Sequence, residues 1–141
     1  MVEQIKFLDE NGTFALRRPE NVSGLYFPLA GEAGLKSALS PNLGGDAKLD
    51  QETFLLEPVS IEDLHASRAT RNIWCTVDGS GVWSVTGVSA GQEAAKFSPA
   101  QDGSQVTAGF MRHTLERTSR TFRLTAAVTA FVPKDRNVEI L

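Results

Sequence analysis

The feature that most constrains the fold is a period of two residues near the C-terminal end of the sequence. Val106, Ala108 and Phe110 fall on one face of an extended chain, and the even-numbered residues from Phe122 to Val132 fall on one face of a second. This period is typical of strands that bury one face. We therefore predict two long antiparallel strands, joined near Thr118-Ser119.

Two turn sequences mark further strand pairs. Glu10-Asn11-Gly12 and Asp78-Gly79-Ser80-Gly81 each separate two strand-prone runs. Asn-Gly and Asp-Gly tolerate the positive φ of tight hairpin turns, so both sequences predict β-hairpins. The flanking runs are Ile5–Asp9, Thr13–Arg17, Asn72–Val77 and Val82–Thr86.

Several shorter segments give weaker signals. Leu25–Ala30 contains Pro28, which predicts an edge or irregular strand because proline cannot donate to a ladder. Thr53–Leu56 predicts a brief buried strand, and Ser60 with Asp63 predicts a helical turn over about 60–67. The connection from Gly87 to Asp102 gives no clear pattern.

Many short strands separated by Gly, Asn, Asp and Pro turns predict an all-β fold, an antiparallel β-sandwich. Residues 1–141 are one domain or a fragment of one. Pro133–Asn137 predicts a turn, and the apolar run Val138–Leu141 follows it. Because domains usually end in polar residues, we expect this sequence to be a fragment.

Composition excludes several functional classes. With 14 Lys and Arg against 17 Asp and Glu, the net charge of -3 provides no basic field for nucleic acid. No apolar run is long enough for a membrane span. The lone Cys75 and an N-terminus without a signal-peptide pattern predict the cytoplasm, with Cys75 as an inert buried thiol.

A charged segment contains Glu62, Asp63, His65, Arg68 and Arg71. These residue types include an acid, a base and partners for an oxyanion, so a catalytic site is one interpretation. A turn that docks on another surface by ion pairs uses the same residue types, and we favour that interpretation over a catalytic site. Without a second His or a Cys nearby, we expect no metal site.

The loop Ser40–Asp46 combines a proline, an asparagine and paired glycines. Its Asn42 and Asp46 are candidate binding residues, but the loop lacks the Lys-Ser/Thr of a phosphate-binding loop. We expect the glycines to serve a specific loop shape.

Aromatic residues offer a second kind of binding site. Tyr26, Trp74 and Trp83 have the flat faces on which sugars stack. For the two tryptophans, which lie in strand patterns, core packing is the favoured role. His113 is expected on the sheet surface.

Several strings together resemble the N-terminal region of the cellobiose-phosphorylase-like glycoside phosphorylases, with β-1,2-oligoglucan (sophoro-oligosaccharide) phosphorylases as the nearest branch. The strings are Leu25–Gly34, Ser40–Asp46, Phe54–His65, Ser67-Arg68, Arg71-Asn72 and Trp83–Gly87. The resemblance implies a larger enzyme in which a super-β-sandwich precedes a helical linker, an (α/α)6 barrel and a small C-terminal domain. Its reaction is reversible, inverting phosphorolysis of a β-glucoside, which releases glucose 1-phosphate.

In such an enzyme the general acid is an Asp of the barrel, which has no counterpart in this sequence. The resemblance therefore implies a non-catalytic domain that packs on the barrel and the subunit interface of a homo-oligomer, beside a β-linked gluco-oligosaccharide. No cofactor is implied, since inorganic phosphate is a substrate of the parent enzyme. The candidate carbohydrate or docking residues are Tyr26, Asn42, Asp46, Asp63, His65, Arg68, Arg71 and Trp83.

Two alternatives remain open. In the first alternative, the chain is a self-sufficient carbohydrate-binding module, and sugars stack on Tyr26 and Trp83. In the second it is an independent enzyme with a site around Asp63 and His65.

Overall fold

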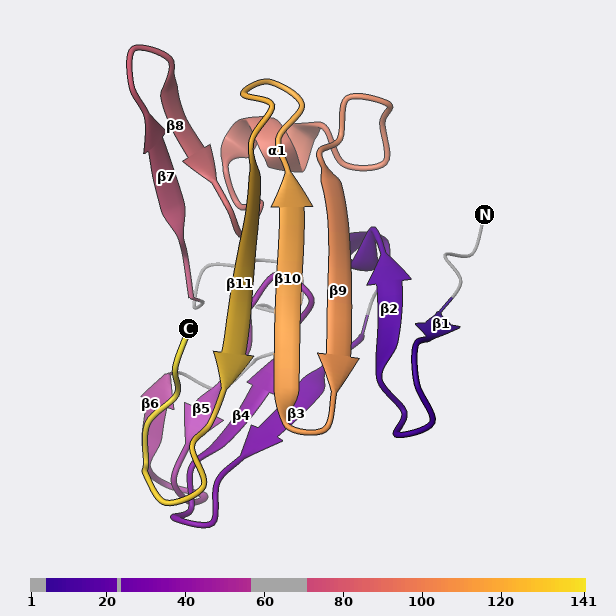
Figure 1. Ribbon diagram of the computed structural model, residues 1–141. Coiled ribbons are helices and arrows are strands. Elements are labelled where there is room, and N and C mark those ends of the chain that lie inside the picture. Colours follow the sequence, from indigo (N-terminus) through magenta and orange to yellow (C-terminus); the bar gives the residue numbers. More distant parts are fainter. Residues whose placement is uncertain (1–4, 23, 57–70) are drawn as a thin grey trace.

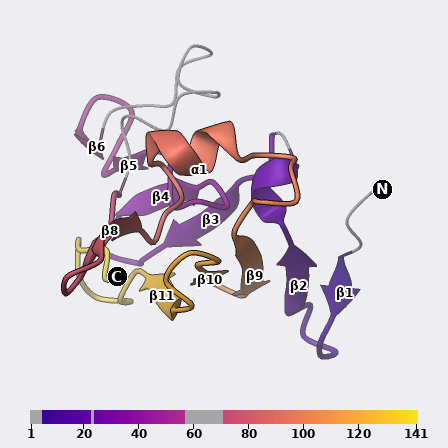
Figure 2. The ribbon, with the colours of Figure 1, turned by 90° about the horizontal axis from the view of Figure 1, so that it is seen from above.

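The structure is a computed structural model that describes residues 5–22, 24–56 and 71–141. Two antiparallel sheets face each other, and a separate hairpin stands beside them (Figure 1). Figure 2 shows the sheets as two layers when the molecule is seen from above. The predicted all-β sandwich is confirmed.

Within the residues that the structure describes, the two layers contain nine strands, and the hairpin adds two more. The five-stranded sheet has the order β1 (Lys6–Phe7), β2 (Phe14–Arg17), β9 (Gly103–Gly109), β10 (Arg112–Thr118) and β11 (Thr125–Phe131). The four-stranded sheet has the order β3 (Phe27–Ala30), β4 (Lys36–Leu39), β5 (Ala47–Lys48) and β6 (Phe54–Leu56). The hairpin consists of β7 (Trp74–Val77) and β8 (Gly81–Ser84). Two short helices, the 3-10 helix η1 (Pro19–Asn21) and α1 (Ala90–Ala94), lie in the connections.

Both predicted hairpins are confirmed. In the first, Phe7 pairs with Phe14, and Gly12 in the turn has a φ of +85°. The carboxylate of Asp9 accepts hydrogen bonds from the amides of Asn11 and Thr13, which fixes the turn. In the second, β7 and β8 pair in the expected antiparallel register.

The region from 103 to 131 contains three strands, so the prediction of two is wrong. Phe110 and Met111 form a tight turn between β9 and β10, and Met111 has a φ of +52°. Inward residues therefore change from even-numbered in β9 to odd-numbered in β10, which a continuous strand cannot do. The turn carries neither Asn nor Gly at its centre, so its sequence gives no turn signal. Phe110, predicted to share the buried face, is 88% exposed.

Of the predictions for the shorter segments, one is confirmed and another is partly wrong. β3 is an edge strand with Pro28 exposed, as predicted. β6 exists, but the prediction that it is buried is wrong, because Phe54 and Leu55 on this edge strand are exposed. The predicted helical turn over about 60–67 lies outside the described residues.

The core fills the space between the two sheets. Leu29, Leu39 and Leu43 approach from the four-stranded side, and Val106 and Leu115 approach from the five-stranded side. These side chains are almost completely buried. No helix in the described residues has the length and apolar character needed to cross a membrane.

Candidate functional site

The Ser40–Asp46 loop has the specific shape that its sequence predicts. The Ser40 amide donates to the Gly44 carbonyl (2.7 Å), and the Ser40 hydroxyl accepts from the Gly44 amide (2.9 Å). Leu43 and Gly45 both have positive φ, of 65° and 112°. A Cβ on Gly45 would lie 1.8 Å from the Ala38 carbonyl oxygen, so glycine is required there.

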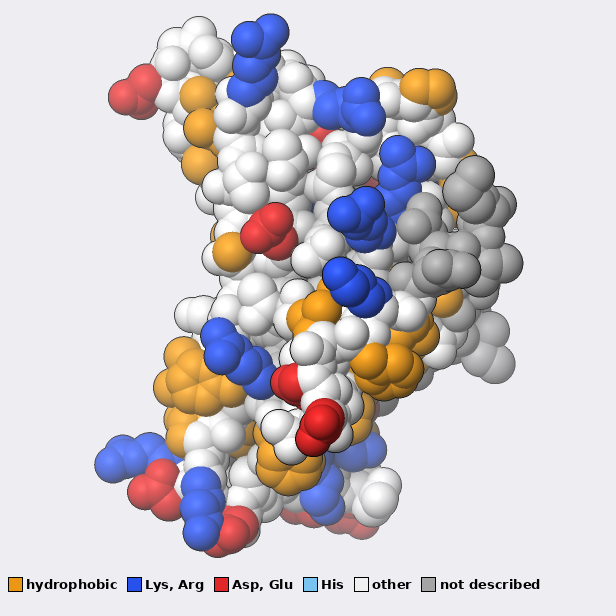
Figure 3. Space-filling model, turned by 45° about the vertical axis from the view of Figure 1, so that its right-hand side comes forward, with side chains coloured by type: hydrophobic (Ala, Val, Ile, Leu, Met, Phe, Trp, Pro, Cys, Tyr) orange, Lys and Arg blue, Asp and Glu red, His pale blue; other side chains and the backbone are white. Residues whose placement is uncertain are grey.

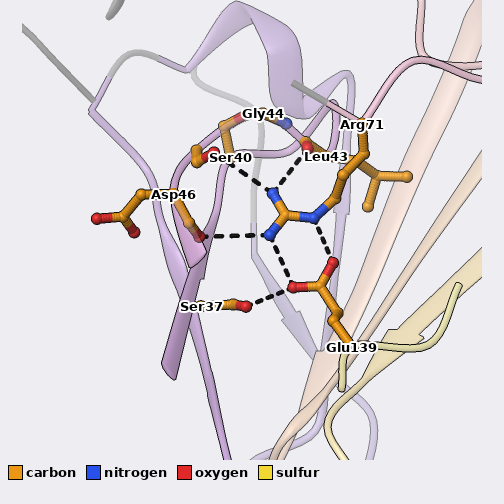
Figure 4. A network of polar contacts seen from close by, with 8 residues as sticks. Ser37, Ser40, Leu43, Gly44, Asp46, Arg71 and Glu139 are labelled. Carbon is orange, nitrogen blue, oxygen red and sulfur yellow. Dashed lines mark hydrogen bonds and ion pairs between the residues drawn. The ribbon is translucent and has the colours of Figure 1, made fainter. Parts of the chain in front are cut away.

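This backbone shape turns three carbonyl groups toward Arg71. Arg71 is 8% exposed, and its guanidinium donates to the carbonyl oxygens of Leu43 (3.3 Å), Gly45 (3.5 Å) and Asp46 (3.3 Å) (Figure 4). Its Nε and one Nη also donate to the two carboxylate oxygens of Glu139. All five donors of the guanidinium are thereby used.

Glu139 brings the C-terminal segment into the network. One of its carboxylate oxygens accepts a hydrogen bond from the hydroxyl of Ser37 on β4. Nearby, the Asn137 side chain accepts from the amide of Leu35 (3.1 Å). The Arg71 network, defined as Ser37, the carbonyls of the Ser40–Asp46 loop, Arg71 and Glu139, therefore joins three segments that are distant in sequence.

The chemistry available to the Arg71 network is limited because its charges are matched. A bidentate arginine–carboxylate pair inside a protein is stabilised when its remaining donors are satisfied, as they are here. The guanidinium has no donor left for a substrate oxyanion in this conformation. The network thus holds the fold together.

Asn42 and Trp83 lie in a second polar cluster, formed with Gln92, Asp102 and Arg117. Asn42 accepts from an Nη of the buried Arg117 (2.9 Å), while Arg117 Nε donates to the Val85 carbonyl (3.0 Å). The indole of Trp83 donates to Asp102 (3.0 Å), which also accepts from Gln92 (2.8 Å). Trp83 is 4% exposed, so it packs in the interior as predicted and is not presented to a ligand. Trp74 on β7 is 51% exposed, so the prediction of core packing is wrong for that residue.

Asp102 is the acceptor at the centre of this second cluster. Burial opposes its ionisation, but hydrogen bonds from the Arg120 amide, the Trp83 indole and Gln92 outweigh burial and hold the pKa of Asp102 below its usual value. The small cavity in the cluster has a volume of about 10 Å³. It has room for about one water molecule.

Tyr26 lies close enough to Asp46 for the charge of the Asp46 carboxylate to act on its hydroxyl. Partial burial, together with the charge of Asp46, raises the pKa of the Tyr26 hydroxyl. The Asp46 carboxylate lies 4.0 Å from Lys48 Nζ. Tyr26 is half-buried, so part of the residue is accessible from outside.

His113 was expected on the sheet surface, and this prediction is wrong. The ring is fully buried and packs against Phe27 at a centroid distance of 4.9 Å, and neither nitrogen has a hydrogen-bond partner among the described residues. Burial, helped by the positive charge of Arg71, lowers the pKa of His113 to about 4. The imidazole is therefore neutral at physiological pH. The extra turn at 110–111 explains the error, because it places odd-numbered residues of β10 inside.

The predicted residues are only partly brought together. Asp46 and Arg71 share one network, and Asn42 and Trp83 share the neighbouring cluster. Asp63, His65 and Arg68 lie outside the described residues. Within the described ranges, no group of three or more His, Cys, Asp or Glu side chains is placed to hold a metal ion. Cys75, expected to be buried, is half-buried on β7.

Sequence reasoning missed Glu139, Asp102 and Arg117, whose roles depend on contacts between different segments of the chain. It also missed α1, although the sequence carries a signal for it. Ser89 and Gln92 form a capping box at its start, and Ser-x-x-Gln is the pattern of that motif.

The outer face of the five-stranded sheet carries two open grooves. One, of about 540 Å³, is lined by polar residues and by Phe110, and the other, of about 530 Å³, is lined by residues that include Arg17, Arg18 and Glu116. Figure 3 shows several basic side chains along the upper and middle part of the side that carries β1 and β2, and a mixture of hydrophobic, basic and acidic side chains toward its lower end. These grooves are shallow and are not enclosed sites.

Comparison with known proteins gives no assignment. No family model matches the sequence, and no curated protein matches it.

Proposed function

We propose that residues 1–141 are a non-catalytic, N-terminal β-sandwich domain of a β-glucan phosphorylase. The parent reaction is reversible, inverting phosphorolysis that releases glucose 1-phosphate. In that enzyme the domain packs on the catalytic barrel and the subunit interface, and it borders the carbohydrate cleft. The sequence strings that resemble the phosphorylases support this proposal, and the sandwich fold is compatible with it.

One observation carries the non-catalytic part of the proposal. The Ser40–Asp46 loop and Arg71 resemble a polar site in sequence, but all five donors of the Arg71 guanidinium bind internal partners. His113 is neutral and enclosed, so it has no contact with a substrate. Neither group is placed for acid–base chemistry.

The parent enzyme provides the direct test. Deleting residues 1–141 should abolish soluble assembly, and co-expression of the domain should restore both assembly and release of glucose 1-phosphate. Arg71→Ala, and likewise Asp63→Ala, should reduce oligomer yield more than kcat of the oligomer that remains. Unchanged assembly with a lost chemical step would reverse the proposal.

A self-sufficient carbohydrate-binding module is the second candidate. It is favoured by Phe110, which is 88% exposed beside the polar groove that Asn11, Thr107 and Arg112 help to line. Aromatic rings next to hydrogen-bonding groups are suited to sugars. Calorimetric titration with sophoro- and cello-oligosaccharides separates the candidates. A docking domain should give no saturable heat, whereas a module should bind and lose binding on Phe110→Ala or Tyr26→Ala.

A further inference from the structure

The two edges of the five-stranded sheet differ in length and protection. One edge is β1, which has two residues and includes Lys6. The other edge is β11, which has seven residues and contains no charge, proline or glycine. Natural sheets usually protect such edges with charges, prolines or bulges, because an open edge pairs with other strands. β11 has none of these features.

The unpaired groups of β11 can be identified from its register. Phe131 and Ile140 exchange both backbone hydrogen bonds, at 3.0 and 2.9 Å. In an antiparallel ladder, every second residue directs its N–H and C=O groups to the same side. Thr125, Ala127 and Thr129 therefore direct theirs to the open edge, where they bind no backbone group of the described residues.

The Phe131–Ile140 pair also sets the direction of any added strand. Leu141 follows Ile140 and falls opposite Ala130, and in Figure 1 the chain at this point runs alongside β11. A strand that continues this ladder would place its next five residues opposite Thr129 to Thr125 in turn.

From this geometry we infer that the open edge of β11 binds an extended segment of the rest of the parent chain, antiparallel to β11 and in the register that Ile140 begins. The inference rests on the proposed function, which makes these residues part of a larger protein. Side chains opposite Val128 and Ala126 would face the inner side, where Val128 packs against the core, and should be apolar. Those opposite Thr125, Ala127 and Thr129 would face the outer side, where threonine hydroxyls pair across the sheet, and should be polar.

A second copy of the chain fits this edge less well. Two β11 strands related by a two-fold axis at Ala127 would pair Thr125 of one copy with Thr129 of the other. That register places Leu124 of the incoming copy opposite Ala130, the position that Leu141 takes in the ladder begun by Ile140. The edge therefore favours a strand in line with Leu141.

Hydrogen exchange of the 1–141 chain tests the inference. Adding Thr-Val-Thr-Val-Thr after Leu141 puts valines on the inner side and should slow amide exchange at Thr125, Ala127 and Thr129 by about tenfold or more. The amides of Ala126 and Val128, which already bind β10, are internal controls. Adding Val-Thr-Val-Thr-Val, or Thr-Val-Pro-Val-Thr with the central N–H removed, should protect the edge much less.

Equal protection by all three extensions, or none by the matched one, would overturn the inference. Protection of the unextended chain that rises with its concentration would also overturn it, in favour of self-association. In the parent protein the same three amides should exchange slowly, and rapid exchange there would exclude the proposed occupant. Loss of the phosphorylase assignment would leave the result on the 1–141 chain unchanged, so the two proposals fail separately.

Discussion

Arg71 and His113 are two of the buried basic side chains, and their surroundings differ. Arg71 is enclosed by three loop carbonyls and the carboxylate of Glu139, so that every donor has an acceptor. His113 is more completely buried, yet within the described part of the chain neither ring nitrogen has a hydrogen-bond partner. Burial of Arg71 therefore depends on its partners, while burial of His113 depends on the ring being neutral.

The contrast shows how this fold accommodates polar groups. The permanent charge of Arg71 is buried where a shaped backbone loop and an acid are both supplied, because an unpaired buried charge costs several kcal/mol. An imidazole can be buried without partners, since it loses its proton instead. The first residue should therefore be sensitive to loss of its partners, and the second to pH.

Removing the Arg71 guanidinium should have the largest effect. Arg71→Met keeps the apolar stem but leaves Glu139 without its partner and three loop carbonyls without donors. We expect a loss of about 3–5 kcal/mol in the free energy of unfolding. Urea denaturation measures it. Arg136→Met, at an exposed position, is the matched control and should change stability by less than about 0.5 kcal/mol. Equal losses for the two variants would contradict the role of the network.

Lowering the pH should destabilise the folded protein through His113, whereas Arg71 keeps its charge. Its pKa is lowered from 6.5 to about 4 in the folded protein, so the unfolded chain binds a proton first as pH falls. Stability should therefore be unaffected above about pH 6.5, should fall between 6.5 and about 4, and should lose at most about 3 kcal/mol from this group. Urea denaturation as a function of pH measures this slope.

His113→Leu separates this titration from that of the carboxylates. The variant lacks the imidazole but retains Asp102, whose lowered pKa also makes stability fall in acid. The difference between the two pH profiles should grow from pH 6.5 down to about 4 and then remain constant. Parallel profiles would show that His113 is already protonated, or is solvated, in the folded protein.

Gly45→Ala should weaken the Arg71 network through the backbone. The new methyl group would meet the Ala38 carbonyl, and the φ of +112° is unfavourable for alanine. We expect a loss of about 2 kcal/mol, measured by thermal and urea denaturation. Gly91→Ala is the control, because a Cβ there meets no atom within 4 Å and alanine favours helix α1. If Gly91→Ala lowered the free energy of unfolding as much as Gly45→Ala, the loss could not be assigned to the shape of the Ser40–Asp46 loop.

The sequence predicts the local parts of this structure better than its contacts. The turn at Asn11-Gly12 and the shape of the Ser40–Asp46 loop follow from residues adjacent in the chain, and both predictions are confirmed. Arg71 was singled out, but its partner Glu139 lies 68 positions away, and no local pattern links them. The burial of His113 was missed because the turn at Phe110–Met111, which reverses the inward face, contains no turn residue.

The smallest predicted effect concerns Ser37, which donates to Glu139 from β4. Ser37→Ala removes one hydrogen bond to a partly buried carboxylate while leaving Arg71 in place, so we expect a loss of about 1 kcal/mol in urea denaturation. A double-mutant cycle with Arg71→Met sharpens the contrast with His113. If Ser37, Glu139 and Arg71 act as one unit, the Ser37→Ala effect should change by at least about 0.5 kcal/mol in the Arg71→Met background. Paired with His113→Leu instead, Ser37→Ala should keep its full effect, because the imidazole shares no hydrogen bond with the network. Additivity in both cycles would mean that the carboxylate is held by independent contacts.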